Sequence, residues 1–487
     1  MNSDRGSFKS RLGIVLATAG SAVGLGNIWR FPVETGQNGG AAFILVYLVC
    51  VFVLGIPMMT AEFIIGRRTH TNITDAYKIL LREKRKEKSE KYKLPDGESQ
   101  PHKGKSYFSL FSLPFSLKNL WPLAGYAGMV CVTLILSYYS VVAGWILKYA
   151  VDAFTGQMAY IVDAGRYFAD FSGSTAAPLL YTVVFILFTH LVIERGVQNG
   201  IERFSKLLMP LLLLLMLILV FSCLTMPGAQ AGLTFLLKPD FAKVTPGVVL
   251  SAMGQAFFSL SIAIGCLSTY ASYFKPDVPL VKTAANVVGL DTLVAIIGGF
   301  IIFPAVFSVE GVAPDAGPGL VFVTLPTIFN SIFNHTPVLG YIFSLIFYLL
   351  LVLAALTSTI SMHEEVTAFF YDRYHISRRR AASVMTGTAI VLGVLCSLSF
   401  GVLADFRPFF GRGFFDAFND LTAQWIMPLS GIVLSLFVGW RLPRTLIEEE
   451  LTNHGTLRLP AFVVPSFMFL IRWVAPLVIT LIFVSEL

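Results

Sequence analysis

The chain has 487 residues, of which 55% are hydrophobic and only 13% charged, and its mean hydropathy is +0.72. Soluble domains average about 45–50% apolar and about 25% charged residues, so this composition excludes a soluble globule of this size. The formal charge of +7 is concentrated in residues 67–118, which hold thirteen Lys or Arg against six Asp or Glu, and a charge confined to one loop between apolar segments argues against a nucleic-acid-binding protein.

Long apolar segments recur along the whole chain. A membrane-spanning helix needs about 20 apolar residues. Segments of that kind lie at residues 11–32, 41–66, 119–150, 176–193, 199–224, 247–272, 282–309, 339–371, 381–404, 420–440 and 466–485. We therefore predict an all-α polytopic membrane protein, a single transmembrane domain over residues 1–487 with about 11 transmembrane helices.

The loops between these segments alternate in charge. Lys and Arg gather in residues 67–118, 195–206, 275–282, 373–380 and 441–458, whereas the intervening loops are charge-poor or acidic. Because cytoplasmic loops carry the excess of Lys and Arg, we predict a cell (plasma or inner) membrane protein with a cytoplasmic N-terminus and an outside C-terminus. Residues 67–118 are then a basic cytoplasmic loop, either solvated or in contact with anionic headgroups.

Two of the expected spans contain residues that weaken a helix. Residues 20–27 read Gly-Ser-Ala-Val-Gly-Leu-Gly-Asn in the first span, and residues 258–265 read Phe-Ser-Leu-Ser-Ile-Ala-Ile-Gly in the sixth. These spans begin two consecutive sets of five, which predicts two repeats, residues 11–224 and 247–440, with an extra helix at 466–485. Paired interruptions of this kind indicate a midplane substrate site in a secondary transporter. Close helix packing through small residues is the alternative for the glycines.

Ionisable residues inside the spans are costly in lipid and therefore candidates for function. Glu62 and Asp291 lie within apolar runs, while Arg30 and Asp420 lie towards span ends. A structural or interfacial role is the alternative for Glu62, Arg30 and Asp420. Residues 357–359 read Thr-Ser-Thr in another apolar run, and such hydroxyls also bond back to their own helix.

The residue pattern resembles the neurotransmitter:sodium symporter family, especially its bacterial amino-acid branch of LeuT-like proteins. The resemblance is carried by residues 11–13 and 24–32, the latter reading Gly-Leu-Gly-Asn-Ile-Trp-Arg-Phe-Pro, and it continues through residues 38–40, 55–57, Glu62, 196–210, 269–273 and 356–358. It covers ten spans and is weakest in residues 82–105 and in the last span. It implies a LeuT-type fold, a five-plus-five inverted repeat whose first and sixth helices are discontinuous.

The resemblance implies two sodium ions. One site would use the carbonyls of Gly20, Val23 and Ala354 with the hydroxyls of Thr357 and Ser358. The other would use the Ala22 carbonyl with Asn27, Ser259 and Asp291. Several family members carry asparagine at the position of Asp291. Animal members need chloride to offset cation charge, and here the carboxylates of Asp291 and Glu62 are expected to replace it. We therefore predict no chloride requirement.

The resemblance also implies a substrate site. Its residues would be Ala22, Gly24, Gly26, Ile135, Tyr139, Phe258, Ser259, Ser261, Ile264, Ser358 and Met362. Amine-carrying relatives have aspartate where this chain has Gly24, so Gly24 leaves room for a substrate carboxylate. An apolar wall then favours a neutral, hydrophobic or aromatic L-amino acid.

Two gates complete what the family implies. Arg30 and Asp420 would form the outer ion pair above Tyr139 and Phe258, and Arg5 and Asp372 the inner pair, supported by Ser272 and Tyr273. We expect a sodium-coupled importer working by alternating access, with the lipid bilayer and a small amino acid as partners. A channel or a membrane-bound amino-acid sensor are the alternatives. Neither an enzyme nor an ATP-driven pump is indicated, since no Walker motif is present.

Overall fold

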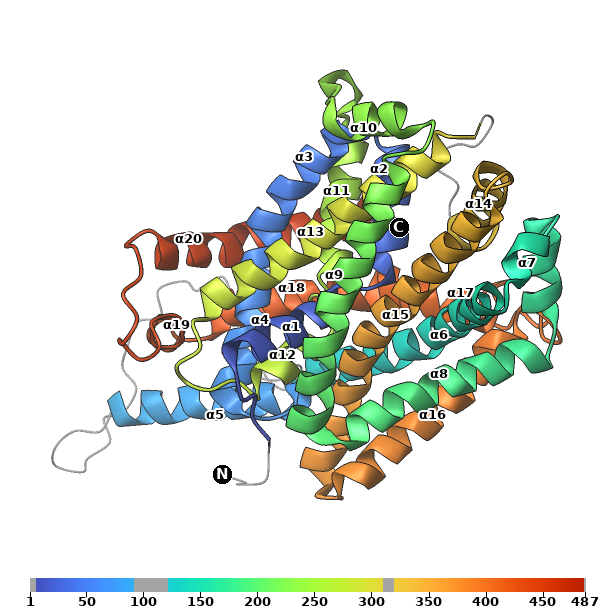
Figure 1. The fold of residues 1–487 in the computed structure, drawn as a ribbon. Coiled ribbons are helices and arrows are strands. Elements are labelled where there is room, and N and C mark those ends of the chain that lie inside the picture. Colours follow the sequence, from blue (N-terminus) through green and yellow to red (C-terminus); the bar gives the residue numbers. More distant parts are fainter. Residues whose placement is uncertain (1–5, 92–120, 310–318, 486–487) are drawn as a thin grey trace, which may run out of the picture.

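The computed structural model describes residues 6–91, 121–309 and 319–485, and within these ranges the regular structure is helical (Figure 1). In these ranges nine helices are long and apolar enough to cross a membrane, and a bent pair supplies a tenth. The expected sixth span is divided between two shorter helices, α11 and α12. The predicted all-helical, polytopic architecture is therefore what the structure shows.

The elements of the first half follow the expected spans closely. In chain order they are α1 (Arg11–Ala22), η1 (Gly26–Arg30), α2 (Phe31–Gln37), α3 (Ala41–Cys50), η2 (Val51–Gly55), α4 (Ile56–Thr69), α5 (Ile73–Lys91), α6 (Trp121–Thr155), η4 (Gln157–Tyr160), α7 (Ala164–Gly173), α8 (Ala176–Glu194), η5 (Val197–Glu202) and α9 (Arg203–Cys223). The basic loop thus begins with a helix, α5, and its residues 92–118 lie outside the described ranges.

The second half is longer because it carries additional short helices. Its elements are α10 (Ala229–Leu237), η6 (Phe241–Lys243), α11 (Pro246–Ser259), α12 (Cys266–Ala271), α13 (Leu280–Val306), η7 (Leu320–Thr324), α14 (Leu325–Ile332), α15 (Pro337–Tyr374), α16 (Arg378–Leu398), α17 (Phe414–Asp420), η8 (Leu421–Ile426), α18 (Met427–Leu436), η9 (Phe437–Arg441), α19 (Arg444–Leu451), α20 (Val463–Phe469), η10 (Leu470–Val474) and α21 (Ala475–Ser485). The ninth span ends earlier than the expected residue 404, at Leu398.

The first break, residues 23–25, separates α1 from η1. The chain bends there by 57° between α1 and the segment formed by η1 and α2. Val23 has an extended backbone (φ −68°, ψ 114°), which stops the α1 hydrogen-bond ladder. Gly24 follows in the space beside Ser358 and Tyr139, where a Cβ would clash. A residue without a side chain lets the chain turn there between packed neighbours.

The second break, residues 260–265, separates α11 from α12 and is more strained. Ser261 and Ala263 have positive φ values of 50° and 69°, and Gly265 follows with φ 96°. Positive φ at a non-glycine residue costs about 1–3 kcal/mol and persists only where surrounding contacts impose it. One such contact is the Glu62 carboxylate, which accepts the Ala263 N–H at 2.6 Å.

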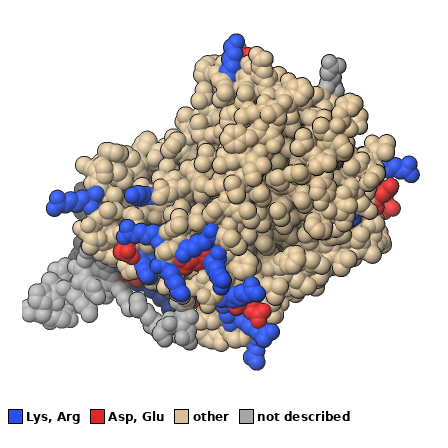
Figure 2. All heavy atoms as spheres, viewed as in Figure 1, with Lys and Arg blue, Asp and Glu red and all other residues tan. Residues whose placement is uncertain are grey.

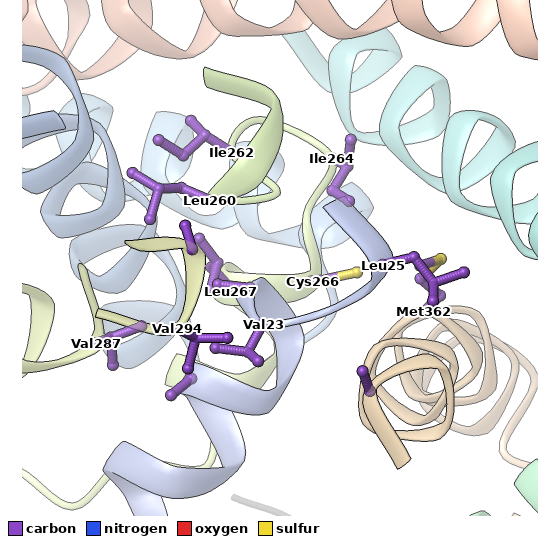
Figure 3. Packing of buried hydrophobic residues seen from close by; sticks show 14 of the residues in the cluster. Val23, Leu25, Leu260, Ile262, Ile264, Cys266, Leu267, Val287, Val294 and Met362 are labelled. Carbon is purple, nitrogen blue, oxygen red and sulfur yellow. The ribbon is translucent and has the colours of Figure 1, made fainter. Parts of the chain in front are cut away.

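The two breaks pack against each other at the centre of the molecule. The Ser261 hydroxyl donates to the Ser21 carbonyl at 3.2 Å, and Figure 3 shows Val23 beside Val294 and Leu267, with Met362 of α15 next to Leu25. Around this centre α15 packs on α6, α8, α9 and α16, while α13 packs on α1, α4 and α9. The interruptions are therefore enclosed by helices and shielded from lipid, as irregular backbone at membrane depth requires.

Charged side chains gather at one end of the molecule. Figure 2 shows Lys and Arg concentrated over the lower part of the view, where Figure 1 places the N-terminus, α5 and α12. We call this the N-terminal face. The middle of the visible surface is almost free of charge, which suits contact with lipid.

Arg67 ties three segments together at the N-terminal face. Its side chain is 3% exposed, and Nε donates to Glu450 Oε2 of α19 at 2.7 Å. Nη1 donates to the Val278 carbonyl at 2.6 Å and to Asn453 Oδ1 at 2.9 Å. The end of α4, the segment before α13 and the segment after α19 therefore share one buried guanidinium, whose planar donors suit such multiple bonding.

We expect Arg67→Ala to lower the free energy of unfolding by about 3 kcal/mol, because the buried Glu450 carboxylate loses its close cation and keeps only the longer contact with Arg68, at 3.5 Å, and breaking a buried ion pair is strongly destabilising. The measurement is thermal unfolding of the purified protein in detergent. The matched control is Arg444→Ala, which removes an exposed pair with Glu448 and should cost about 0–1 kcal/mol. Equal losses in the two variants would contradict the buried clamp.

Candidate functional site

A cavity of about 550 Å³ lies where the two breaks meet α6 and α15. All eleven residues expected at the substrate site line it: Ala22, Gly24, Gly26, Ile135, Tyr139, Phe258, Ser259, Ser261, Ile264, Ser358 and Met362. The cavity therefore brings together residues of α1, η1, α6, α11 and α15 and of both breaks.

The upper part of the cavity is aromatic and was not anticipated. It is formed by residues of α6, α7, η7, α17 and the segment before it, namely Tyr138, Trp145, Phe168, Phe322, Phe400 and Phe415. Trp145 contacts the rings of Phe168, Phe322, Phe400 and Phe415. No local sequence signal marks these residues, because each is an ordinary aromatic in an apolar run.

Gly24 lies at the narrowest point of the first break. A Cβ at this position would be 2.3 Å from Ser358 Oγ and 3.1 Å from the Tyr139 hydroxyl. The Gly24 N–H donates to Asn27 Oδ1 at 2.9 Å, and the Leu25 N–H donates to the Tyr139 hydroxyl at 3.2 Å. The cavity thus has backbone amides and a hydroxyl at one end, a polar patch in a mostly apolar wall.

The residues expected at one sodium site lie together beside this patch. Thr357 Oγ1 donates to the Ala354 carbonyl at 2.9 Å and contacts the Val23 carbonyl at 3.3 Å. Ser358 Oγ donates to the same Val23 carbonyl at 3.1 Å. Gly20 also faces Thr357. Thr357, Ser358, Val23 and Ala354 therefore bring neutral oxygens together, a donor set that suits a hard monovalent cation.

Asn27, Ser259 and Asp291, three of the four residues expected at the other sodium site, form a second buried cluster. Asn27 Nδ2 donates to Asp291 Oδ1 at 2.7 Å and contacts Ser259 Oγ at 3.3 Å, while Ser259 Oγ donates to Asp291 Oδ2 at 2.9 Å. Asp291 is fully buried. No ion pair involving it occurs among the described residues, so its charge calls for a cation or a proton.

Glu62 is held by the second break and by α12. Its carboxylate accepts the Ala263 N–H, the Ser268 N–H at 3.1 Å and the Ser268 hydroxyl at 3.1 Å. No hydrogen bond joins it to Asp291 in the described part of the chain. The physical reason is that the second break exposes backbone donors directly opposite α4, and these donors hold the carboxylate.

The expected outer ion pair is not formed in this structure. Arg30 lies 3.6 Å from the Glu34 carboxylate, one turn further along, and its guanidinium stacks 4.1 Å above the Phe258 ring. Asp420 pairs with Arg412 instead. Arg30 and Asp420 each pair with another residue in place of one another. The sequence could not show the pair of Arg412 with Asp420, because the fold brings that loop residue to the helix.

At the inner side, Arg5 lies outside the described residues. Asp372 accepts the Asn72 N–H at 3.0 Å, and the Tyr273 hydroxyl donates to Glu364 Oε1 at 2.7 Å. The Ser272 hydroxyl donates to the Thr269 carbonyl at 2.6 Å, within its own segment. Expected gate residues Asp372 and Tyr273 thus both bond to elements around the N-terminal face.

Comparisons with known proteins agree with this geometry. The Sodium:neurotransmitter symporter family matches residues 5–81 and 164–487. An uncharacterized sodium-dependent transporter, YhdH of Bacillus subtilis (strain 168), is 36% identical over 98% of this chain and 97% of its own. The human sodium- and chloride-dependent GABA transporter 2 is 24% identical over 80% of this chain and 66% of its own.

A solved structure is also similar to this protein in its fold. The crystal structure of MhsT in complex with L-phenylalanine superimposes with a TM-score of 0.81 at 39% identity, covering 99% of this chain and 100% of MhsT. The predicted fold, an all-α membrane protein of the LeuT type, is confirmed. By family and by fold, the chain belongs to the Sodium:neurotransmitter symporter family and is a sodium-dependent transporter, not an enzyme.

Proposed function

We propose that the protein imports a neutral L-amino acid with a hydrophobic or aromatic side chain, together with two sodium ions and without a chloride requirement. One observation carries this proposal: a cavity with a polar end at Gly24 and an otherwise apolar wall lies between two buried oxygen clusters. Such a cavity matches an amphipathic ligand whose carboxylate and side chain lie at opposite ends.

The polar end suits a carboxylate. The amides around Gly24 and the Tyr139 hydroxyl are donors at a helix interruption, where anions bind favourably. Ile135, Ile264 and Met362 line the apolar part, and a flexible methionine adapts to different side-chain shapes. MhsT, which was solved with L-phenylalanine, supports an aromatic substrate.

Sodium would bind in the two oxygen clusters, each next to a break. The neutral cluster of Thr357 and Ser358 offers hydroxyl and carbonyl oxygens. The cluster of Asn27 and Ser259 adds the carboxylate of Asp291. A fixed carboxylate beside a cation supplies the charge that chloride would otherwise supply. Chloride is therefore not required in this proposal.

Alternating access would open the cavity to each side in turn. The Phe258 ring, covered by Arg30, closes it on one side, and the packed N-terminal face, with Asp372 and Tyr273, closes it on the other. The basic residues of that face favour a cytoplasmic location for it in the cell membrane, with the C-terminus outside.

Gly24→Ala is expected to weaken L-phenylalanine binding to the purified protein in sodium by more than about tenfold, because the new methyl group would occupy the carboxylate position and clash with Ser358 Oγ. Binding is measured with radiolabelled L-phenylalanine. The control is Gly289→Ala on α13, where a Cβ meets nothing within 4 Å. Unchanged binding by Gly24→Ala would contradict the carboxylate position.

Thr357→Val is expected to raise the sodium concentration needed for half-maximal uptake into liposomes by about tenfold or more, because one oxygen is lost from a cation site. Potassium should not replace sodium for the wild type. The control is Thr133→Val, which loses a hydroxyl bonded to its own helix at Met129. Equal sodium dependence in both variants would exclude Thr357 as a ligand.

Replacing chloride by gluconate should leave wild-type uptake unchanged, since the Asp291 carboxylate stays in place. Asp291→Ala should abolish uptake, whereas Asp291→Asn should weaken it and make it respond to added chloride. The measurement is initial uptake at fixed sodium with either anion. A collapse of wild-type uptake in gluconate would overturn chloride independence.

The same liposomes separate the two alternatives. Sodium currents that flow without any amino acid would indicate a channel. Binding in detergent without accumulation in vesicles would indicate a sensor. A competition panel of the common amino acids, in sodium and in potassium, then identifies the preferred substrate.

A further inference from the structure

Glu365 is a buried carboxyl group that neither the sodium clusters nor the cavity wall uses. It lies on α15 one turn beyond Met362, on the side towards the N-terminal face, and its exposed fraction is 1%. The helix packs there against α12 and α6. The group is therefore placed between the cavity and the face that is expected to open to the cytoplasm.

Glu365 has few and weak hydrogen-bond partners for a buried carboxyl group. Oε2 accepts a hydrogen bond from the Cys266 thiol at 3.1 Å, and Oε1 has no hydrogen-bond partner among the residues that the structure describes. A Cβ on Gly265 would lie 2.5 Å from Oε1, so the carboxyl group is pressed against the backbone of the second break. A thiol is a weak donor, which gives little compensation for a negative charge.

Two other buried carboxylates on these elements, Glu364 and Glu62, have more hydrogen-bond or ion-pair partners than Glu365 has. Glu364, the neighbouring residue, pairs with Arg378 and accepts the Tyr273 hydroxyl. Glu62 on α4 accepts three donors from the second break and α12. Both carboxylates thus accept strong N–H or O–H donors, whereas Glu365 accepts only a thiol. Burying an uncompensated carboxylate costs several kcal/mol, whereas the neutral acid avoids most of that cost.

The titratable groups that face Glu365 come from three other helices. Cys266 comes from α12, Glu62 from α4 and Cys131 from α6, and none of them brings a positive charge. Arg378 of α16 is engaged by Glu364. Among the residues that the structure describes, Glu365 makes no ion pair.

We propose that the Glu365 carboxyl group is a proton-binding site, which holds a proton while α12 packs on α15 and releases it when that contact opens to water. On opening, the O–H bond breaks, the proton passes to a water molecule at the N-terminal face and a hydrated carboxylate remains. On closing, the carboxylate takes a proton back from the same side. Proton binding therefore opposes opening of this face.

This inference rests on the proposed function for its transport consequence. The test measures initial sodium-driven uptake of L-phenylalanine by reconstituted full-length protein, with the pH on each side of the membrane varied in turn from about pH 6 to about pH 9. We expect the wild-type rate to rise by at least about threefold with pH on the side of the N-terminal face only.

Glu365→Gln, which keeps the shape of the neutral acid, should show at every pH the low rate that the wild type shows at acidic pH. The control Glu448→Gln changes an exposed residue of α19 and should keep the wild-type response. The same pH profile in Glu365→Gln and in the wild type would overturn the proposal, as would a wild type without any response.

A second measurement does not depend on transport. Thermal unfolding in detergent should show the wild-type midpoint falling relative to that of Glu365→Gln as pH rises, because the unfolded chain ionises Glu365 and the closed protein does not. A constant difference between the two proteins would overturn the proton site. If no amino acid is taken up while this relative fall is seen, the proposed function fails and the proton site stands.

Discussion

A backbone group that leaves its helix at membrane depth finds no water to bond with, and every such group must be satisfied from within the protein. Two interrupted helices at the centre of this molecule create that demand at residues 23–25 and 260–265. The Val23 carbonyl is satisfied by hydroxyls of α15 and the Leu25 amide by Tyr139. The Ala263 amide is satisfied by Glu62. Much of the polar chemistry in the core follows from this requirement.

The same requirement explains why the ion clusters and the cavity are adjacent. A hydroxyl that bonds a broken helix's carbonyl is also an oxygen available to a cation, as at Thr357 and Ser358. An amide freed by the break is also a donor available to a carboxylate, as at Leu25. Occupancy by cation and substrate would therefore replace internal hydrogen bonds, which links ligand binding to the conformation of the breaks.

The sequence was sufficient for the helical architecture, because it depends on local signals, whereas the residues of the cavity were predicted only through the resemblance to a known family. The length of each span follows from the length of its apolar run, and the glycines in residues 20–27 mark the first break. The groups that bind each charged side chain could not be predicted from the sequence. Arg412 reaches Asp420, and Ala263 and Ser268 hold Glu62, through contacts that join residues distant in sequence. The aromatic upper wall was missed for the same reason, since Trp145 gathers rings from several helices.

The guanidinium of Arg67 has a mechanical consequence. It fastens the end of α4 to Glu450 and Asn453, which lie on and just after α19 in the connection that leads into α20. A rotation of α4 would therefore also move α19, and with it the connection to the final span, α20 to α21. The helix appended after the two repeats is thus coupled, through Arg67 and α19, to the same helix whose Glu62 holds the second break.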